Sequence, residues 1–223
     1  AAEQLFASLH GILRDNKELR LSGGHQEHIS FEIASVNGQI RFYVWVPKTL
    51  QSFVEGQIYS QYPTVQIHQA DEDYTEHERD HEVAYSTELT LTTDEFLPIR
   101  TFQNFEVDPL AGITGTLAKL ETTGEELWIQ VLVRPIPDDW QNAADRYINS
   151  IKNGRMFSLP GFGGSMQWLI GVLGALWQPP EQGVGQSAKI ELSDRDKTRI
   201  SEAEKKATKL GYEVKIRLVY MGE

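Results

Sequence analysis

The feature that most constrains the fold is the dipeptide Asn37-Gly38, which separates two runs of strand-forming residues at 29–36 and 39–46. Both central residues of a two-residue type I′ turn need a positive φ, which Asn and Gly adopt more readily than other residues. The flanking runs are rich in β-branched and aromatic side chains, which favour strands. The sequence therefore predicts an antiparallel hairpin, and the fold must contain a sheet built on it.

Strands and helices are predicted to alternate after the hairpin. Apolar residues on one face predict a helix of about three turns between Pro47 and Pro63, and a short strand follows at 64–68. Further on, the pattern predicts a strand at 84–92, a helix that begins at Asp108-Pro109, and a buried strand at 127–134.

Strand, helix, strand thus occurs twice, at 39–68 and 84–134. A doubled βαβ unit with antiparallel links is a ferredoxin-like arrangement, in which helices cover one face of the sheet. The predicted class is α+β. Near the carboxyl end, Ser193 with Asp196 three residues on resembles a capping box and predicts a helix start, and this helix and the strand after it either extend the sheet or start a second one. The predicted divisions are an amphipathic helix, expected to end near Asp15-Asn16, and its linker, the ferredoxin-like domain, an apolar insertion with a Gly/Pro linker, and a helix-strand unit. They span 1–27, 28–152, 153–188 and 189–223.

Charge and composition exclude several functions. The net charge is −11, and residues 71–95 hold most of the excess of acids. Such a surface repels phosphate backbones, so we expect no direct contact with nucleic acid. Cysteine is absent, which excludes disulfides, thiolate metal sites and cysteine nucleophiles. The first residues show neither a start methionine nor the basic flank of a signal peptide, so we expect a fragment of a longer protein.

The insertion at 153–188 contains an apolar block, whose side chains must be buried against another surface. As a helix, the run 168–177 would span about 15 Å, half of the bilayer core of about 30 Å. It therefore needs a subunit or domain contact, or, as the alternative, shallow insertion of 166–177 at a membrane surface. The expected interface residues are Trp168, Leu169, Leu173, Leu176 and Trp177.

One motif points to a different chemistry. His77, Glu78 and His81 satisfy the HExxH pattern of zinc hydrolases, in which two histidines one helical turn apart bind the metal. A zinc enzyme also needs a dry cleft and a third ligand, and the surrounding tract is too charged to supply the first. We interpret it as a charged surface connection, and a metal-dependent hydrolase is the alternative.

Other catalytic signatures are absent from the sequence. It contains no GxxxxGK[ST] phosphate loop and no nucleophile elbow, so we expect neither an enzyme nor a cofactor. His25 and His28 show no partner spacing and are interpreted as surface residues. A ligand-binding α+β module is a third alternative, but the sequence reveals no convergent polar cluster for it.

Several short segments of the sequence resemble the region that precedes the ATPase module in type IV secretion or conjugative-transfer-like ATPases of candidate-phyla (Patescibacteria-type) bacteria. They lie at 41–47, 53–59, 62–63, 105–110, 128–131 and 212–217. The resemblance covers most of 1–135 and 190–221 and includes no motor residue. It implies a non-catalytic domain that positions a hexameric DNA- or protein-translocating motor. It also implies self-association or contact with other secretion subunits, at the cytoplasmic face of the inner membrane.

Overall fold

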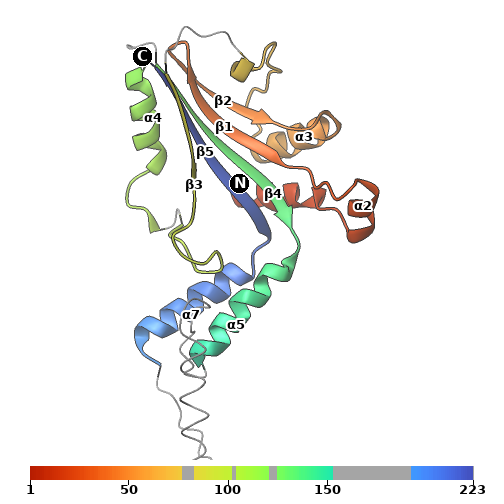
Figure 1. The fold of residues 1–223 in the computed structure, drawn as a ribbon, viewed down its shortest axis with the longest axis vertical. Helices are drawn as coiled ribbons and strands as arrows, with labels where there is room; N and C mark the ends of the chain where they lie inside the picture. The colour runs from red at the N-terminus through yellow and green to blue at the C-terminus, as the bar shows by residue number, and fades with distance from the viewer. Residues whose placement is uncertain (77–82, 102–103, 121–124, 153–191, 223) are drawn as a thin grey trace, which may run out of the picture. The chain divides into compact units, whose positions relative to one another are not determined.

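The computed structural model describes residues 1–76, 83–101, 104–120, 125–152 and 192–222 of the chain. They form two compact units, one from 1–95, 99–138 and 209–223, the other from 96–98 and 139–208. The first unit contains the sheet, whose strands are labelled in Figure 1. Its helices and strands are α1 (Ala2–Leu9), α2 (Asn16–Leu21), β1 (Ile29–Val36), β2 (Gln39–Trp45), α3 (Gln51–Gln61), β3 (Val83–Leu89), α4 (Pro109–Leu120), β4 (Glu126–Ile136) and β5 (Gly211–Gly222).

The sheet has the strand order β2-β1-β4-β5-β3, and every neighbouring pair is antiparallel. The predicted α+β class is therefore confirmed. The predicted hairpin is present, with φ values of 50° at Asn37 and 69° at Gly38. The carboxy-terminal strand extends this same sheet, since β5 lies between β4 and β3.

One half of the predicted doubled βαβ pattern is wrong. Residues 64–68 form no strand; Val65 is exposed, and the segment continues as irregular chain to the 3₁₀ turn at Tyr74–Glu76. Two apolar residues in a five-residue run bury too little surface to hold a strand at a sheet edge. The second half is present, as β3, α4 and β4 with β5 inserted between the two strands.

The amino-terminal helix is shorter than predicted, since α1 ends at Leu9 and a 3₁₀ turn follows. A second helix, α2, begins where the first was expected to end. Asp15 caps it by accepting from the backbone N–H groups of Lys17 and Glu18, and the Glu18 side chain accepts from the Asp15 N–H. This capping box satisfies donors that would otherwise lack partners at the helix start.

The strand register gives the sheet two unlike faces, because directly opposed residues share a face. One carries no charged side chain, and we call it the uncharged face. Its side chains are those of Ile29, Phe31, Ile33, Ser35, Ile40, Phe42, Val44, Val83, Tyr85, Thr87, Leu89, Leu127, Ile129, Val131, Val133, Pro135, Tyr212, Val214, Ile216, Leu218 and Tyr220. The other, the polar face, carries charged residues from all five strands, which include Glu32, Arg41, Glu88, Glu126, Arg134, Glu213, Lys215 and Arg217.

Helices α1 and α3 cover one end of the uncharged face. Leu9 of α1 and Val54 of α3 are fully or almost fully buried against Ile29 and Val133. Phe6 adds edge-on ring contacts to Phe31 and Tyr212, with centroids 5.5 and 5.8 Å apart. The main core of the unit therefore lies at this end.

The second unit is a pair of helices, α5 (Gln141–Lys152) and α7 (Asp194–Ala207). Ile148 of α5 packs with Ile200 and Ala203 of α7. Ser193 caps α7 by accepting from the Asp196 N–H, as the sequence predicts. The predicted insertion at 153–188 lies outside the described residues.

Candidate functional site

The residues that the sequence singles out for contact or metal binding lie outside the described residues. These are the expected interface (Trp168, Leu169, Leu173, Leu176 and Trp177) and the candidate metal ligands (His77, Glu78 and His81). In the part of the chain that the structure describes, no group of three or more His, Asp or Glu side chains is placed to hold a metal ion.

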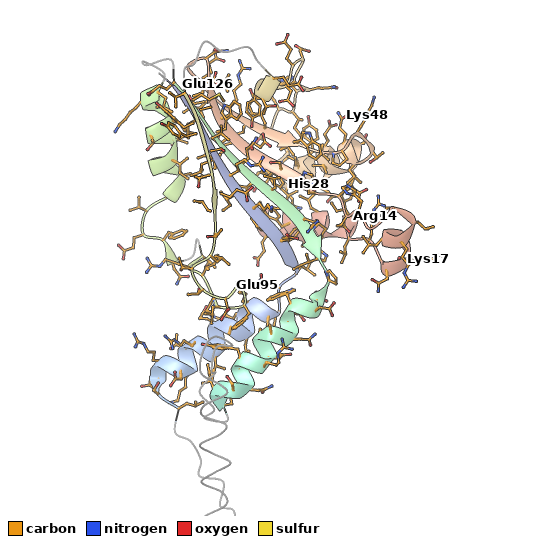
Figure 2. The ribbon with its side chains drawn as sticks, in the orientation of Figure 1. Arg14, Lys17, His28, Lys48, Glu95 and Glu126 are labelled. Carbon is orange, nitrogen blue, oxygen red and sulfur yellow. The ribbon has the colours of Figure 1, made fainter. Side chains whose placement is uncertain are left out.

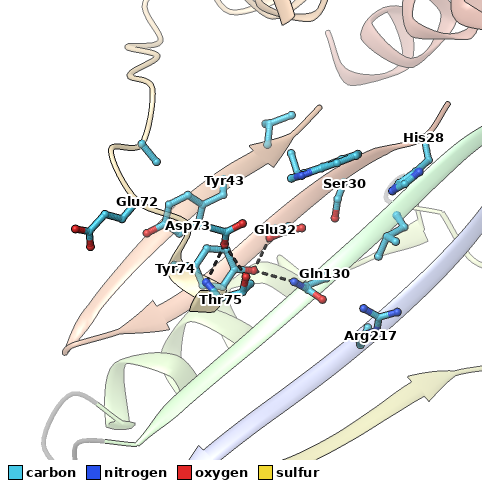
Figure 3. Close-up of a pocket in the computed structure, with 14 residues that line it drawn as sticks. His28, Ser30, Glu32, Tyr43, Glu72, Asp73, Tyr74, Thr75, Gln130 and Arg217 are labelled. Carbon is cyan, nitrogen blue, oxygen red and sulfur yellow. Dashed lines mark hydrogen bonds between the residues drawn. The ribbon is translucent and has the colours of Figure 1, made fainter. Parts of the chain in front are cut away.

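A pocket of about 400 Å³ lies on the polar face of the sheet, within the first unit. The strands β1, β2, β4 and β5 form its floor, and residues 70–75 run over it from the side of β2 (Figure 3). Because the floor is a hydrogen-bonded sheet, the residues on it keep fixed positions relative to one another. We take this pocket as the candidate site.

Three buried polar side chains meet at the pocket. The Tyr74 hydroxyl donates to Glu32 Oε2 and accepts from Gln130 Nε2 at 2.9 Å (Figure 3). Glu32 and Gln130 are directly opposed on β1 and β4, and the three residues are between 8% and 9% exposed. Burial, together with the adjacent Glu32 carboxylate, raises the pKa of Tyr74, so its hydroxyl keeps its proton and remains a donor.

Aromatic rings flank this cluster on two sides. Tyr43 stacks on Tyr74 with ring centroids 4.6 Å apart, and His28 stacks on Trp45 at 4.8 Å. His28 stands directly before β1 (Figure 2) and is half-buried, so its interpretation as a plain surface residue is wrong. Burial lowers the pKa of His28, with His25 and Arg134 acting in the same direction, which favours a neutral imidazole.

Ser30 supplies the remaining polar atom of the floor. Its side chain is 3% exposed, and its Oγ atom has no hydrogen-bond partner. Ser30 lies between the two stacks on β1, opposite Trp45 in the register (Figure 3). Buried hydroxyl groups are satisfied in most proteins, so an unsatisfied one beside a pocket is a feature that a ligand would explain.

The charges around the pocket are mainly negative. Glu32, Glu72 and Asp73 line it, against the single guanidinium of Arg217. Arg217 also lies 3.3 Å from Glu88 on the neighbouring strand β3, which offsets its charge. The pocket is therefore negative on the side of Glu32.

Sequence reasoning missed this site because its members are far apart in the chain. Glu32 and Tyr74 are 42 positions apart, and Tyr74 and Gln130 are 56 positions apart. The available signal was a charged or amide residue inside each of two otherwise apolar strands, at 29–36 and 127–134. The convergent polar cluster that the sequence did not reveal is thus present.

The whole chain, residues 1–223, matches the model of one family, described as a domain of unknown function (DUF8128), and the chain belongs to that family. No curated protein and no solved structure matches it. No described helix is both long enough and apolar enough to cross a bilayer.

Proposed function

We propose that this chain is a non-catalytic assembly domain whose uncharged sheet face binds a second copy of the same chain. The observation that carries the proposal is the exposure of large apolar side chains on that face. The exposed fraction is 70% at Phe42, 68% at Tyr85 and 53% at Leu89. Val214 and Val44 are 49% and 40% exposed on the same face.

Four of the exposed side chains lie on the two edge strands, β2 and β3, and Val214 lies on β5 beside β3. The register places all five on one face of the sheet. Helices α1 and α3 cover one end of this face, and α4 packs against β1, β2 and β4 at the other end, where Ser35 is fully buried. Soluble monomers rarely expose contiguous apolar patches larger than a few hundred Å², and larger ones mark interaction surfaces. A face with this many exposed apolar side chains favours burial against another surface.

The occupant we propose is another copy of the chain. At a net charge of −11, two copies repel each other wherever their charged surfaces meet. The uncharged face is the surface on which close approach avoids that repulsion. Homo-oligomers of soluble proteins form most often through such self-complementary patches.

The resemblance noted in the sequence supplies the setting of this proposal. The domain would belong to a type IV secretion or conjugation-like ATPase and would hold copies of the motor together at the cytoplasmic face of the inner membrane. DNA would be contacted by the motor, not by this acidic domain. The apolar block at 168–177 would provide a second contact, with another subunit or with the membrane surface.

Sedimentation velocity over a range of concentrations tests the proposal. Phe42→Asp should weaken self-association at least about tenfold, because it places a charge in an apolar contact. Leu21→Asp is the matched control, since Leu21 is 81% exposed on α2 and does not belong to the sheet. A monomeric wild-type chain, or equal effects of the two variants, would contradict the proposal. Leu173→Asp measures the contribution of the apolar block in the same assay.

The pocket on the polar face favours a second candidate function, a ligand-binding module. It combines a fixed sheet floor, stacked aromatic rings and a small set of buried polar atoms, as ligand sites usually do. The two functions are compatible, because the two surfaces lie on opposite faces of one sheet.

A further inference from the structure

We propose that the pocket on the polar face binds an organic cation, an alkylammonium or guanidinium group that lies against Glu32 between the two aromatic stacks. This inference goes beyond the assembly function and is independent of it, because the pocket and the uncharged face are on opposite sides of the sheet.

The first argument is the position of the Glu32 carboxylate. It is 8% exposed, and its hydrogen bond in the described structure comes from the neutral hydroxyl of Tyr74. Among the described residues, no Lys, Arg or His forms an ion pair with it. Burying a carboxylate is unfavourable unless a counter-charge and hydrogen bonds compensate for the lost hydration. A cationic ligand would supply both.

The second argument is the arrangement of the rings. Tyr43 and Trp45 project from the same face of β2, where Tyr43 is directly opposite Glu32 and Trp45 is directly opposite Ser30. Each is held by a stacked partner, Tyr74 or His28. Aromatic faces attract cations electrostatically, and such rings around a carboxylate form a typical environment for ammonium and guanidinium groups.

The third argument is the unpaired acceptor. A guanidinium presents five N–H donors and an ammonium three, so either needs several acceptors in one place. Ser30 Oγ has no partner, and Gln130 uses its amide nitrogen toward Tyr74, which leaves the amide oxygen as an acceptor in the same cluster. Both residues line the pocket (Figure 3).

An anionic ligand fits less well. The carboxylates of Glu32, Glu72 and Asp73 line the pocket, and the guanidinium of Arg217 is already beside Glu88 at 3.3 Å. An anion would meet three carboxylates, whereas a cation would find partners.

The test measures the binding of butylguanidinium and of its neutral isostere butylurea. NMR detects binding as a shift of the indole N–H signal of Trp45. That signal is assigned by its loss in Trp45→Phe. Butylguanidinium should shift it saturably, and butylurea should bind at least about tenfold more weakly, because the two molecules differ chiefly in charge. No saturable shift at millimolar butylguanidinium, or equal binding of both molecules, would overturn the proposal.

Two matched variants locate the charge that matters. Glu32→Gln should weaken butylguanidinium binding at least about tenfold. Glu213→Gln makes the same change of net charge on the same face, at a residue outside the pocket that pairs with Arg134, and should change binding less than about twofold. Equal effects of the two variants would overturn the proposal. Should Glu32→Gln fail to fold, Trp45→Leu provides the test, since Trp45 is 45% exposed and its loss should weaken binding severalfold. Because this variant lacks the Trp45 indole signal, its binding is compared with that of the wild type by isothermal titration calorimetry.

Two sources could present this cationic group, a free metabolite or an arginine side chain of a protein. The second arm uses the peptide acetyl-Gly-Arg-Gly-amide and its counterpart with neutral citrulline. Tighter binding of the arginine peptide than of butylguanidinium would identify a protein ligand, and weaker binding would identify a small molecule. Glu32→Gln must reduce whichever binding is observed for the site to stand. Self-association of the variants, measured separately, shows whether the assembly function holds on its own.

Discussion

The two faces of the sheet are formed by the same strands but differ in which side chains they expose and which they bury. On the uncharged face, α1 and α3 bury one end and α4 packs at the other, and apolar side chains of the edge strands such as Phe42 and Leu89 remain exposed. On the polar face, charged side chains form cross-strand pairs, such as Arg134 with Glu213 and Arg217 with Glu88, and the buried polar cluster lies at its centre. One face leaves apolar side chains of its edge strands exposed, whereas the other buries a carboxylate and a cluster of polar side chains.

The comparison teaches that stability and recognition are separated on this sheet. Leu9, Val54 and Val133 are buried to at least 96% and belong to the core. The exposed apolar residues lie outside that core, whereas Tyr74 of the Glu32 cluster packs in a second core with Trp128 and Met221. We propose binding as the reason that the apolar residues stay exposed and that the Glu32 carboxylate stays buried.

The largest expected effect contrasts the two ends of the uncharged face. Leu9→Ala should lower the free energy of unfolding by about 2–5 kcal/mol, because it removes a fully buried side chain. Phe42→Ala should change it by less than about 1 kcal/mol, since that ring is 70% exposed. Urea denaturation at concentrations where the chain is monomeric measures both. Similar losses would mean that the exposed end also belongs to the core.

The next largest effect concerns the polar cluster. Tyr74→Phe should cost about 1–3 kcal/mol, because Glu32 and Gln130 would both lose a buried hydrogen-bond partner. Tyr43→Phe is the control, since Tyr43 belongs to the same stack and its hydroxyl forms none of those bonds. Chemical denaturation of the two variants gives the difference. If both cost the same, the ring stack rather than the hydrogen bonds stabilises the pocket.

The smallest effect is a loss of stability at alkaline pH. Burial raises the pKa of both Tyr74 and Tyr212 above the ordinary value of 10.0, and the Glu32 carboxylate raises that of Tyr74 further. Above about pH 10 the unfolded chain loses these protons while the folded chain keeps them, so stability is complete below that pH and falls as the pH rises.

By pH 11 the loss should be greater in the wild type than in the double variant Tyr74→Phe/Tyr212→Phe by about 1 kcal/mol for each of the two hydroxyls, relative to each protein at pH 8. Urea unfolding at a series of pH values measures it. Parallel pH profiles for the two proteins would show that these hydroxyls do not titrate differently on folding.

Local signals of the sequence predicted local structure well. The Asn37-Gly38 hairpin, the proline at the start of α4 and the Ser193 cap of α7 all appear where the residues indicated, because each depends on neighbours in the chain. The prediction of a strand at 64–68 was wrong because a strand is stable only when it pairs with a neighbouring strand. The local pattern does not show whether such a neighbour is present.

The candidate site required information that no local pattern holds. Glu32 and Gln130 meet only because β1 and β4 pair in one particular register, and Tyr74 joins them from an irregular segment. A one-residue shift of that register would have moved Glu32 to the other face. The exposure of the uncharged face was equally hidden, since alternating strands look the same whether or not a helix covers them.

The position of β5 affects how the domain is made. It follows every other strand in sequence, yet it lies between β4 and β3. While the chain emerges from the ribosome, β3 has no neighbour and the inner edge of β4 is open until the twelve residues of β5 are available. During that interval both unpaired edges can pair with foreign strands, so the risk of aggregation is greatest before β5 has been synthesised.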